Sequence, residues 1–293
     1  MSAYALRVAE LRDDRSHGGS WLARHAVETI VLEAATPAAD AEELLEHLLT
    51  VARELAAARP ELGSVTAACG RLVAAASRSW ALSATEMRRL VLDEARALLD
   101  QRDRAARSIA VQLAPRLENS IVLTHSASAV VREAVLHTPP VRLLCTASDP
   151  DGEGRVFADE LRGAGIKVEL VEDGAGPLKA RGSRLVLLGA DTIYRDGTLL
   201  NRCGTRAIAD AAAQSRVPVV VAAESIKVAP FPTPEASPNP DRTDLTAPDL
   251  IEQFVTEDGS ISPDDVETLA DRTPFLREGY ELIRAAGEIP AAR

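Results

Sequence analysis

The segment Gly189-Ala190-Asp191, followed by Asn201-Arg202-Cys203-Gly204-Thr205, holds the residues of this chain that are best suited to chemistry. It comes directly after the apolar run 185–188, so Asp191 stands where a buried strand would end. The glycine-threonine step then opens a helical segment. A site that combines a carboxylate with a helix N-terminus can hold a small anionic ligand and move a proton.

Polar residues also follow four other short apolar runs in the second half of the chain. They are Thr124, His125 and Ser126 after the first run, Thr146, Ser148 and Asp149 after the second, Asp173 after the third, and Glu224, Ser225 and Lys227 after the fifth. In a parallel sheet, ligands bind outside the carboxyl ends of the strands. We therefore expect these residues to converge on one crevice, with backbone N–H donors from helices that begin at Ser126 and Gly204.

Each of these residues also has a simpler structural explanation. Ser126 or Thr205 could only cap a helix, which is the usual role of such residues. His125 could pack against its own loop, Asp191 could cap a turn with Gly197, and Lys227 could be a solvated lysine. The group as a whole argues for a ligand site more strongly than any of its members.

The elements that would position these residues follow from the hydrophobic pattern. Residues 20–115 are rich in Ala, Leu, Glu and Arg and predict helices, expected at 20–35, 39–58, 62–78 and 83–113. Beyond residue 120, short apolar runs alternate with helical segments. The expected strands are 121–123, 141–145, 168–171, 185–188 and 217–221, and the expected helices are 126–137, 154–164, 175–181 and 204–215. Strands that are apolar on both faces predict a parallel sheet covered on both sides.

The predicted fold class is therefore α/β. We expect an N-terminal helical domain at 1–117, followed by a Rossmann-like, doubly wound parallel-sheet domain with a ligand crevice at 118–293. The stretch 230–248 is rich in Pro, Thr, Ser and Asp and predicts a long surface loop. A last helix is expected near 263–270, with Pro263 in its first turn.

Composition excludes several classes of function. The net charge is −11, from 33 basic and 44 acidic residues, which argues against direct nucleic-acid binding but leaves room for a phosphate in a local pocket. The three cysteines form no C-x-x-C pair, and no apolar run is long enough for a membrane span. We therefore expect that the protein holds no metal or cofactor. We also expect it to be located in the cytoplasm. The chain has no Walker A loop, no G-x-G-x-x-G after its first strand and no G-x-S-x-G elbow.

Several segments, in this order, carry a resemblance to a known family. They are Ile121-Val122-Leu123-Thr124-His125-Ser126, Gly189-Ala190-Asp191 with Asp196-Gly197, Asn201-Arg202-Cys203-Gly204-Thr205, and Val221-Ala222-Ala223-Glu224-Ser225-Ile226-Lys227, with weaker echoes at Arg59-Pro60 and 254–263. The chain resembles the translation initiation factor 2B α/β/δ-subunit family, which also contains methylthioribose-1-phosphate and ribose-1,5-bisphosphate isomerases. The resemblance implies a helical domain before a Rossmann-like domain, a homodimer, and a phosphorylated sugar or nucleotide as ligand.

The resemblance also implies a set of site residues. Asp191 matches the aspartate that partners a catalytic cysteine in aldose–ketose proton transfer, and Ser126 stands at the cysteine position. The implied ligand contacts are Arg59, Thr124, His125, Ser148, Asn201, Arg202, Gly204, Thr205 and Lys227. A serine hydroxyl is a far weaker acid and nucleophile than a thiol, so this departure speaks against the known isomerase step.

A second departure follows the second strand. The family usually carries Thr-Glu-Ser/Thr-Arg-Pro there, whereas this chain has Thr146-Ala147-Ser148-Asp149-Pro150. An aspartate in place of the arginine should repel phosphate, unless Arg155, Lys179 or Arg202 compensates. Cys145 is expected to be a buried strand residue rather than a substitute thiol, and Gly18-Gly19-Ser20 is a weak match to a glycine-containing ligand loop.

Three functions remain open on this basis. The first is a binding protein for a phosphorylated sugar or nucleotide without classical isomerase chemistry, with a regulatory or interaction role. The second is a divergent sugar-phosphate isomerase that uses Asp191 as acid and base. The third is an oligomeric scaffold with a vestigial pocket.

Overall fold

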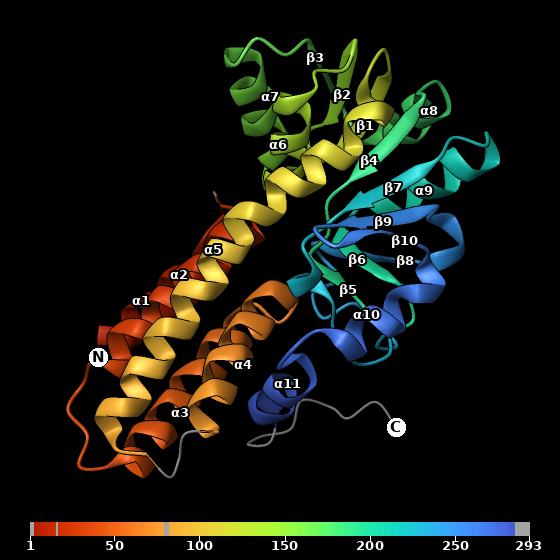
Figure 1. The fold of residues 1–293 in the computed structure, drawn as a ribbon. Helices are drawn as coiled ribbons and strands as arrows, with labels where there is room; N and C mark the ends of the chain where they lie inside the picture. The colour runs from red at the N-terminus through yellow and green to blue at the C-terminus, as the bar shows by residue number, and fades with distance from the viewer. Residues whose placement is uncertain (1–2, 16, 79–81, 285–293) are drawn as a thin grey trace.

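The computed structural model describes residues 3–15, 17–78 and 82–284. Its first half is a bundle of helices, and the longest of them runs from the bundle to the sheet (Figure 1). The bounds are α1 Ala3–Asp13, α2 Gly19–Ala34, α3 Ala41–Ala58, α4 Gly63–Ser77 and α5 Ala84–Leu117. The four helices predicted between residues 20 and 113 are confirmed, whereas α1 was not expected from the sequence. Among the described residues, no helix is both long and apolar enough to cross a membrane.

Helix α5 belongs to two cores. It begins with a capping box, in which the side chain of Ser83 accepts from Glu86 N and the Glu86 carboxylate accepts from Ser83 N. Met87, in its first turns, packs in the core of the helical bundle. Ile109 and Leu113, further along, pack against the sheet. The expected division at 117/118 therefore falls at the end of a helix that both halves share.

Seven strands form the main sheet, in the order β10-β9-β7-β4-β1-β2-β3. The bounds are β1 Ile121–His125, β2 Arg142–Thr146, β3 Val168–Val171, β4 Leu185–Leu188, β7 Val219–Ala222, β9 Gln253–Thr256 and β10 Gly259–Ile261. All neighbours are parallel except the β10–β9 pair. The chain runs outward from β1 to β3 and then returns to β4 on the other side of β1. This is a doubly wound sheet, and its ligand crevice is expected between the carboxyl ends of β1 and β4.

Helices cover both faces of this sheet, as its apolar strands require. Their bounds are α6 Ala129–His137, α7 Glu153–Gly163, α8 Gly176–Arg181, α9 Thr205–Gln214 and α10 Val266–Arg272. Val122 of β1 faces the core shared with α5, α6 and α7, and the next residue, Leu123, faces the core shared with α8, α9 and α10. The predicted α/β architecture is confirmed.

A second, smaller sheet was missed from the sequence. Its antiparallel strands lie in the order β5-β6-β8, with bounds β5 Thr192–Ile193, β6 Leu199–Arg202 and β8 Thr243–Thr246. Strand β8 lies within the stretch 230–248 that was predicted to be a loop. These strands are short, and their polar residues hide the alternating pattern that marks a strand.

The last described helix, α11 (Leu276–Arg284), returns to the helical bundle and lies beside α4 (Figure 1). Gly70 and Gly279 meet where these helices cross, because a Cβ on Gly70 would lie 2.7 Å from the backbone of Gly279. The hydroxyl of Tyr280 donates to Gly63 O at 3.2 Å. Helix α11 thus fixes the helical bundle against the sheet half.

Candidate functional site

A cavity of about 270 Å³ opens at the carboxyl ends of β1 and β4, the two neighbouring strands between which the strand order reverses. The loop before α2 and the first turns of α6 and α7 complete its wall. Five of the residues predicted from the sequence line it, namely His125, Asp191, Asn201, Arg202 and Lys227. The expectation that polar residues at the strand ends share one crevice is therefore met in part.

Backbone hydrogen bonds hold Asp191 in place, and its side chain takes no part in them. Its N–H donates to Leu200 O at 3.0 Å, and its carbonyl accepts from Gly63 N at 3.2 Å. Its Oδ2 atom is buried and has no hydrogen-bond partner among the described residues. Such an atom costs about 1–3 kcal/mol unless a donor reaches it. The suggested turn cap is instead made by Asp196, which accepts from Thr198 N.

Lys227 is buried beside Asp191, so the interpretation of a solvated lysine is wrong. It lies in the short 3-10 turn η2 (Ser225–Lys227), and its Nζ donates to Ala190 O at 2.6 Å. Burial lowers the pKa of Lys227, although the negative charges of Glu224 and Asp191 oppose that shift. The cavity therefore has a lysine and a carboxylate on the same wall.

Ser126 is buried between His125 and Ala127, which both line the cavity, and adopts a left-handed backbone conformation with φ of 60°. Its hydroxyl donates to Glu153 Oε2 at 2.9 Å. The other oxygen of Glu153 lies 2.6 Å from Nη2 of Arg202. Sequence reasoning missed Glu153, although an acidic residue in the first turn of a helix is a recognisable pattern. The Ser126 hydroxyl is thus engaged by a carboxylate.

Arg202 and Asn201 come from strand β6 and reach the cavity from the side of the small sheet. Burial opposes the charge of Arg202, but the carboxylates of Asp191 and Glu153 outweigh it and raise the pKa of the guanidinium. Its Nη1 atom is buried and has no hydrogen-bond partner among the described residues. Asn201 donates to the hydroxyl of Thr205, which in turn donates to Arg202 O at 2.6 Å.

His125 uses both ring nitrogens within the protein. Its Nδ1 lies 2.5 Å from the hydroxyl of Thr146, and its Nε2 lies 2.9 Å from Cys203 O. Burial lowers the pKa of His125. The ring therefore joins β1 to β2 and to the loop before α9, rather than packing against its own loop.

Five other predicted residues do not line this cavity, namely Arg59, Thr124, Ser148, Gly204 and Thr205. Gly204 shows why the expected anion site at α9 is wrong. Its N–H donates to the Asp244 carboxylate at 2.8 Å, so a side chain of this chain already occupies that helix N-terminus. Helix α6 begins at Ala129 with Ser128 as its N-cap, so the alternative that Ser126 caps a helix is wrong.

The negative charge of Asp149, which was expected to repel phosphate, lies outside the cavity. Asp149 is paired with Arg155 at 2.7 Å and is not among the lining residues. Arg155 and Lys179 do not compensate for a missing arginine there, because Arg155 is also 3.2 Å from Glu172 and Lys179 donates to Glu169. Arg202 does line the cavity, where it is paired with Glu153.

Cys145 is a buried residue of β2, as predicted. Burial raises the pKa of its thiol to about 12, so the thiolate is not available near neutral pH. Among the described residues, no group of three or more His, Cys, Asp or Glu side chains could hold a metal ion.

The loop Gly18-Gly19-Ser20 lines the cavity at the start of α2, together with Arg15 and Trp21. The cavity therefore receives residues from both halves of the chain. Its lining residues include a carboxylate with one buried oxygen that has no donor among the described residues, an amide, two buried cations and a helix N-terminus. This combination suits a small polar ligand that carries hydroxyl groups and negative charge.

Comparisons with known proteins agree on one family. Residues 15–242 match the model described as the Initiation factor 2 subunit family. A putative translation initiation factor eIF-2B subunit 2-like protein of Pyrococcus abyssi is 34% identical over 227 residues, which cover 75% of this chain and 78% of that protein. The ribose 1,5-bisphosphate isomerase of Archaeoglobus fulgidus is 31% identical over 288 residues, which cover 88% of this chain and 90% of that protein.

A solved structure supports the same fold. The translation initiation factor eIF-2B of Pyrococcus horikoshii OT3 superposes with a TM-score of 0.78 at 24% identity, over 90% of this chain and 98% of that chain. From the family match and the two relatives, this chain belongs to the initiation factor 2 subunit family.

Proposed function

We propose that the main cavity binds a phosphorylated sugar, and that this chain does so without the thiol-dependent isomerase step of its enzymatic relatives. The observation that carries the proposal is Asp191, a lining residue of the cavity whose buried Oδ2 has no hydrogen-bond partner among the described residues. A sugar hydroxyl would supply that donor. Lys227 and Arg202 lie on the same cavity and would attract the phosphate.

The absence of a thiol supports the binding role. Ser126 stands where the family's isomerases carry a cysteine, and its hydroxyl is committed to Glu153 at 2.9 Å. An alcohol is a far weaker acid than a thiol, so Ser126 would be a poor partner for Asp191 in proton transfer. A ligand could therefore be held beside Asp191 without being converted.

Calorimetric titration tests this proposal with ribose 5-phosphate, ribose 1,5-bisphosphate, methylthioribose 1-phosphate and adenosine monophosphate. The wild type should bind at least one of these sugar phosphates, and Asp191→Asn should weaken that binding by about tenfold or more. Asp210→Asn is a matched control, because Asp210 lies on α9 outside the cavity and pairs only loosely with Arg206. The proposal fails if no sugar phosphate binds, or if both variants bind like the wild type.

The second candidate is a sugar-phosphate isomerase that uses Asp191 as acid and base. The likeness to the Archaeoglobus fulgidus ribose 1,5-bisphosphate isomerase over most of both chains favours it. In that role, Asp191 would take a proton from one sugar carbon and return it to the neighbouring one. Ketose formation that Asp191→Asn abolishes and Asp210→Asn does not would establish this activity.

The resemblance to the family also leads us to propose a homodimer. Light scattering coupled to size exclusion would show twice the chain mass of 31.2 kDa, whereas a single chain mass would contradict it.

A further inference from the structure

Another cavity, of about 250 Å³, lies at the junction between the helical bundle and the sheet half, and we call it the junction cavity. Helices α4 and α5 form its wall on the side of the bundle. The turn η2, the turn between β9 and β10, and the connection from α10 to α11 form the other side. Of the described residues that line it, none also lines the main cavity. The junction cavity is therefore a separate hollow of the molecule.

Arg102 of α5 lines the junction cavity, and two of its three nitrogens lack an acceptor. Its side chain is only 6% exposed. Its Nη2 donates to Ser20 O at 3.0 Å, whereas its Nε and Nη1 atoms are buried and have no hydrogen-bond partner in the described part of the chain. A buried charged donor without an acceptor is costly, because it has lost water and gained nothing in return. An acceptor supplied by a ligand would remove this cost.

The carboxylates that line the junction cavity near the turn η2 are engaged elsewhere. Glu224 lies 3.5 Å from Nε of Arg102, which is too long for a good hydrogen bond. Its other oxygen accepts from the hydroxyl of Ser20 at 3.3 Å. Glu257 accepts from the N–H of Ser225 at 2.9 Å and from its hydroxyl at 2.6 Å, so both of its oxygens are used. The protein thus holds carboxylates in this cavity without giving one to Arg102.

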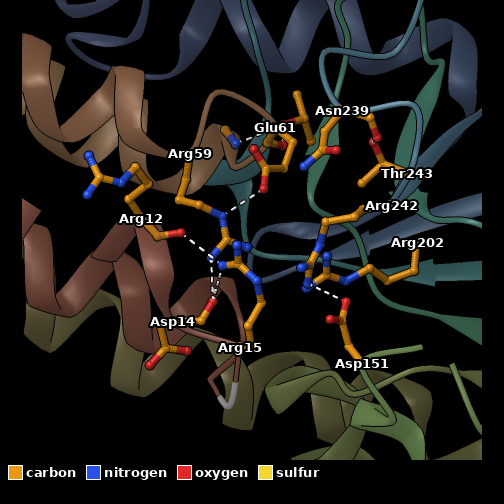
Figure 2. Close-up of polar contacts among 12 residues, drawn as sticks. Arg12, Asp14, Arg15, Arg59, Glu61, Asp151, Arg202, Asn239, Arg242 and Thr243 are labelled. Atoms are coloured by element: carbon orange, nitrogen blue, oxygen red, sulfur yellow. Dashed lines mark hydrogen bonds and ion pairs between the residues drawn. The ribbon is translucent and has the colours of Figure 1, made fainter. Parts of the chain in front are cut away.

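Two arginines elsewhere in the chain show the usual arrangement. Figure 2 shows Arg59 with Glu61 and Arg242 with Asp151, and these ion pairs are closed at 2.7 and 2.5 Å. At such distances a carboxylate compensates a guanidinium group through a charge-assisted hydrogen bond. Arg102 has no carboxylate at a comparable distance in the described structure, and this sets it apart from them.

The charges that line the junction cavity favour an anion with a single charge. Three cations and three carboxylates line it, namely Arg71, Arg102, Arg272, Glu224, Glu257 and Asp258. Arg71 is already paired with Glu94, and Arg272 lies 3.9 Å from Asp258. A phosphate dianion would therefore meet as many carboxylates as guanidinium groups, with only Arg102 open to it. One carboxylate group matches Arg102 without adding a second charge.

The rest of the wall is apolar in part. Leu98 of α5, Ile226 of the turn η2 and Leu276 of α11 all line the junction cavity. A small hydrocarbon group that packs against them would be removed from water, which stabilises binding in proportion to its buried area. The ligand that fits this wall is therefore both apolar and charged.

We propose that the junction cavity binds a small apolar carboxylic acid in its ionised form. The carboxylate accepts hydrogen bonds from Arg102, and the hydrocarbon part packs against Leu98, Ile226 and Leu276. The bond from Nη2 of Arg102 to Ser20 O is kept, because the ligand uses the other two nitrogens. This site lies on one side of the turn η2, whose last residue, Lys227, lines the main cavity.

The anion 3-methylbutanoate is a direct probe, because it joins one carboxylate to a branched hydrocarbon group. We expect nuclear magnetic resonance titration to show that it binds to the wild type. The uncharged 3-methylbutanamide and the shorter acetate should each bind about tenfold more weakly or worse. No binding of 3-methylbutanoate would overturn the proposal. Equal binding of the acid and its amide would do the same, and so would displacement of the acid by inorganic phosphate at equal concentration.

Arg102→Met removes the guanidinium group and keeps an apolar side chain of similar length. It should weaken binding of 3-methylbutanoate by about tenfold or more. Arg104→Met is the matched control, because Arg104 lies exposed on the same helix and outside the junction cavity. Binding by Arg102→Met that equals that of Arg104→Met would contradict the proposal.

A crystal structure of the wild type with 3-methylbutanoate gives a test that needs no variant, since Arg102 also holds Ser20. The carboxylate should lie within hydrogen-bond distance of Nε or Nη1 of Arg102. A carboxylate found in the main cavity, against Lys227 or Arg202, would overturn the assignment.

This site does not depend on the sugar-phosphate site proposed above. Asp191→Asn should bind 3-methylbutanoate as the wild type does, whether or not that variant still binds a sugar phosphate. The function proposed for the main cavity can therefore fail while this proposal stands. Loss of 3-methylbutanoate binding in Asp191→Asn would place the acid in the main cavity and overturn the proposal.

Discussion

The carboxylate of Glu153 lies 2.6 Å from Nη2 of Arg202 and joins the first turn of α7 to strand β6 across the main cavity. Its second oxygen accepts the hydrogen bond from Ser126. Both groups are almost completely buried, with side-chain exposures of 10% for Glu153 and 9% for Arg202. A ligand phosphate that approaches Arg202 must therefore compete with an internal carboxylate.

Replacing Glu153 by Gln should reveal this competition. The substitution keeps the size of the side chain and an acceptor for Ser126, but it removes the negative charge that holds Arg202. We expect phosphorylated-sugar binding to become about tenfold tighter, while the free energy of unfolding falls by about 1–3 kcal/mol. Calorimetry and urea denaturation measure the two effects. Glu252→Gln, which alters the more exposed Glu252–Arg116 pair outside the cavity, is the control. Weaker binding by Glu153→Gln would contradict the competition.

His125 should make the protein less stable in mild acid. Burial lowers the pKa of His125 in the folded state, so the unfolded chain binds a proton more readily. Well above its unfolded pKa of about 6.5, His125 has no effect on how the free energy of unfolding depends on pH. Below that value the free energy of unfolding decreases as pH falls, by at most about 1.4 kcal/mol per pH unit. Urea denaturation at pH 7.5 and 5.5 should show a smaller difference for His125→Gln than for the wild type. An equal pH dependence in the two proteins would show that burial does not disfavour protonation of the His125 imidazole.

Lys227 should make anion binding sensitive to high pH. Its folded pKa is lowered by burial, with Glu224 and Asp191 opposing the shift, so its charge is lost below the ordinary lysine value of about 10.4. Affinity for a sugar phosphate should therefore fall as pH rises through the alkaline range. Titrations at increasing pH should show this fall in the wild type and in Lys179→Met. Lys227→Met should bind weakly throughout, and an unchanged alkaline fall in that variant would assign the effect to another group.

The crossing of α4 and α11 should not tolerate a side chain. A Cβ on Gly70 would lie 2.7 Å from the carbonyl carbon of Gly279, and backbone atoms cannot move aside cheaply. Gly70→Ala should lower the free energy of unfolding by about 1–3 kcal/mol or more. Gly163→Ala, at the end of α7, meets nothing within 4 Å and should be neutral or slightly stabilising. Similar melting temperatures for the two variants would contradict this close packing.

The sequence was sufficient for the parts of the fold that rest on local pattern. The run 185–188 is apolar on both faces, so the strand before Asp191 and the crevice at its end could be predicted. Strands β6 and β8 could not, because Asn201 and Arg202 interrupt the apolar pattern and their partners at Asp244 and Thr243 lie far along the chain. Long-range pairing, rather than local propensity, forms that small sheet.

The same limit applies to the site. Asp191 and Lys227 could be predicted because each follows an apolar run. Glu153 was missed because its contact with Arg202 forms only in the folded chain. Conversely, Gly204 was expected to bind an anion, but Asp244 fills that position from a distant strand.

The central claim, that a phosphorylated sugar binds beside Asp191 without being isomerised, can be tested by one nuclear magnetic resonance titration. Ribose 1,5-bisphosphate is added to the wild-type protein, and both its line widths and its conversion are followed over hours. Our account predicts broadened sugar resonances, a loss of that broadening in Asp191→Asn, and no ketose. Ketose that accumulates with the wild type, or sugar resonances that stay sharp at every protein concentration, would contradict it.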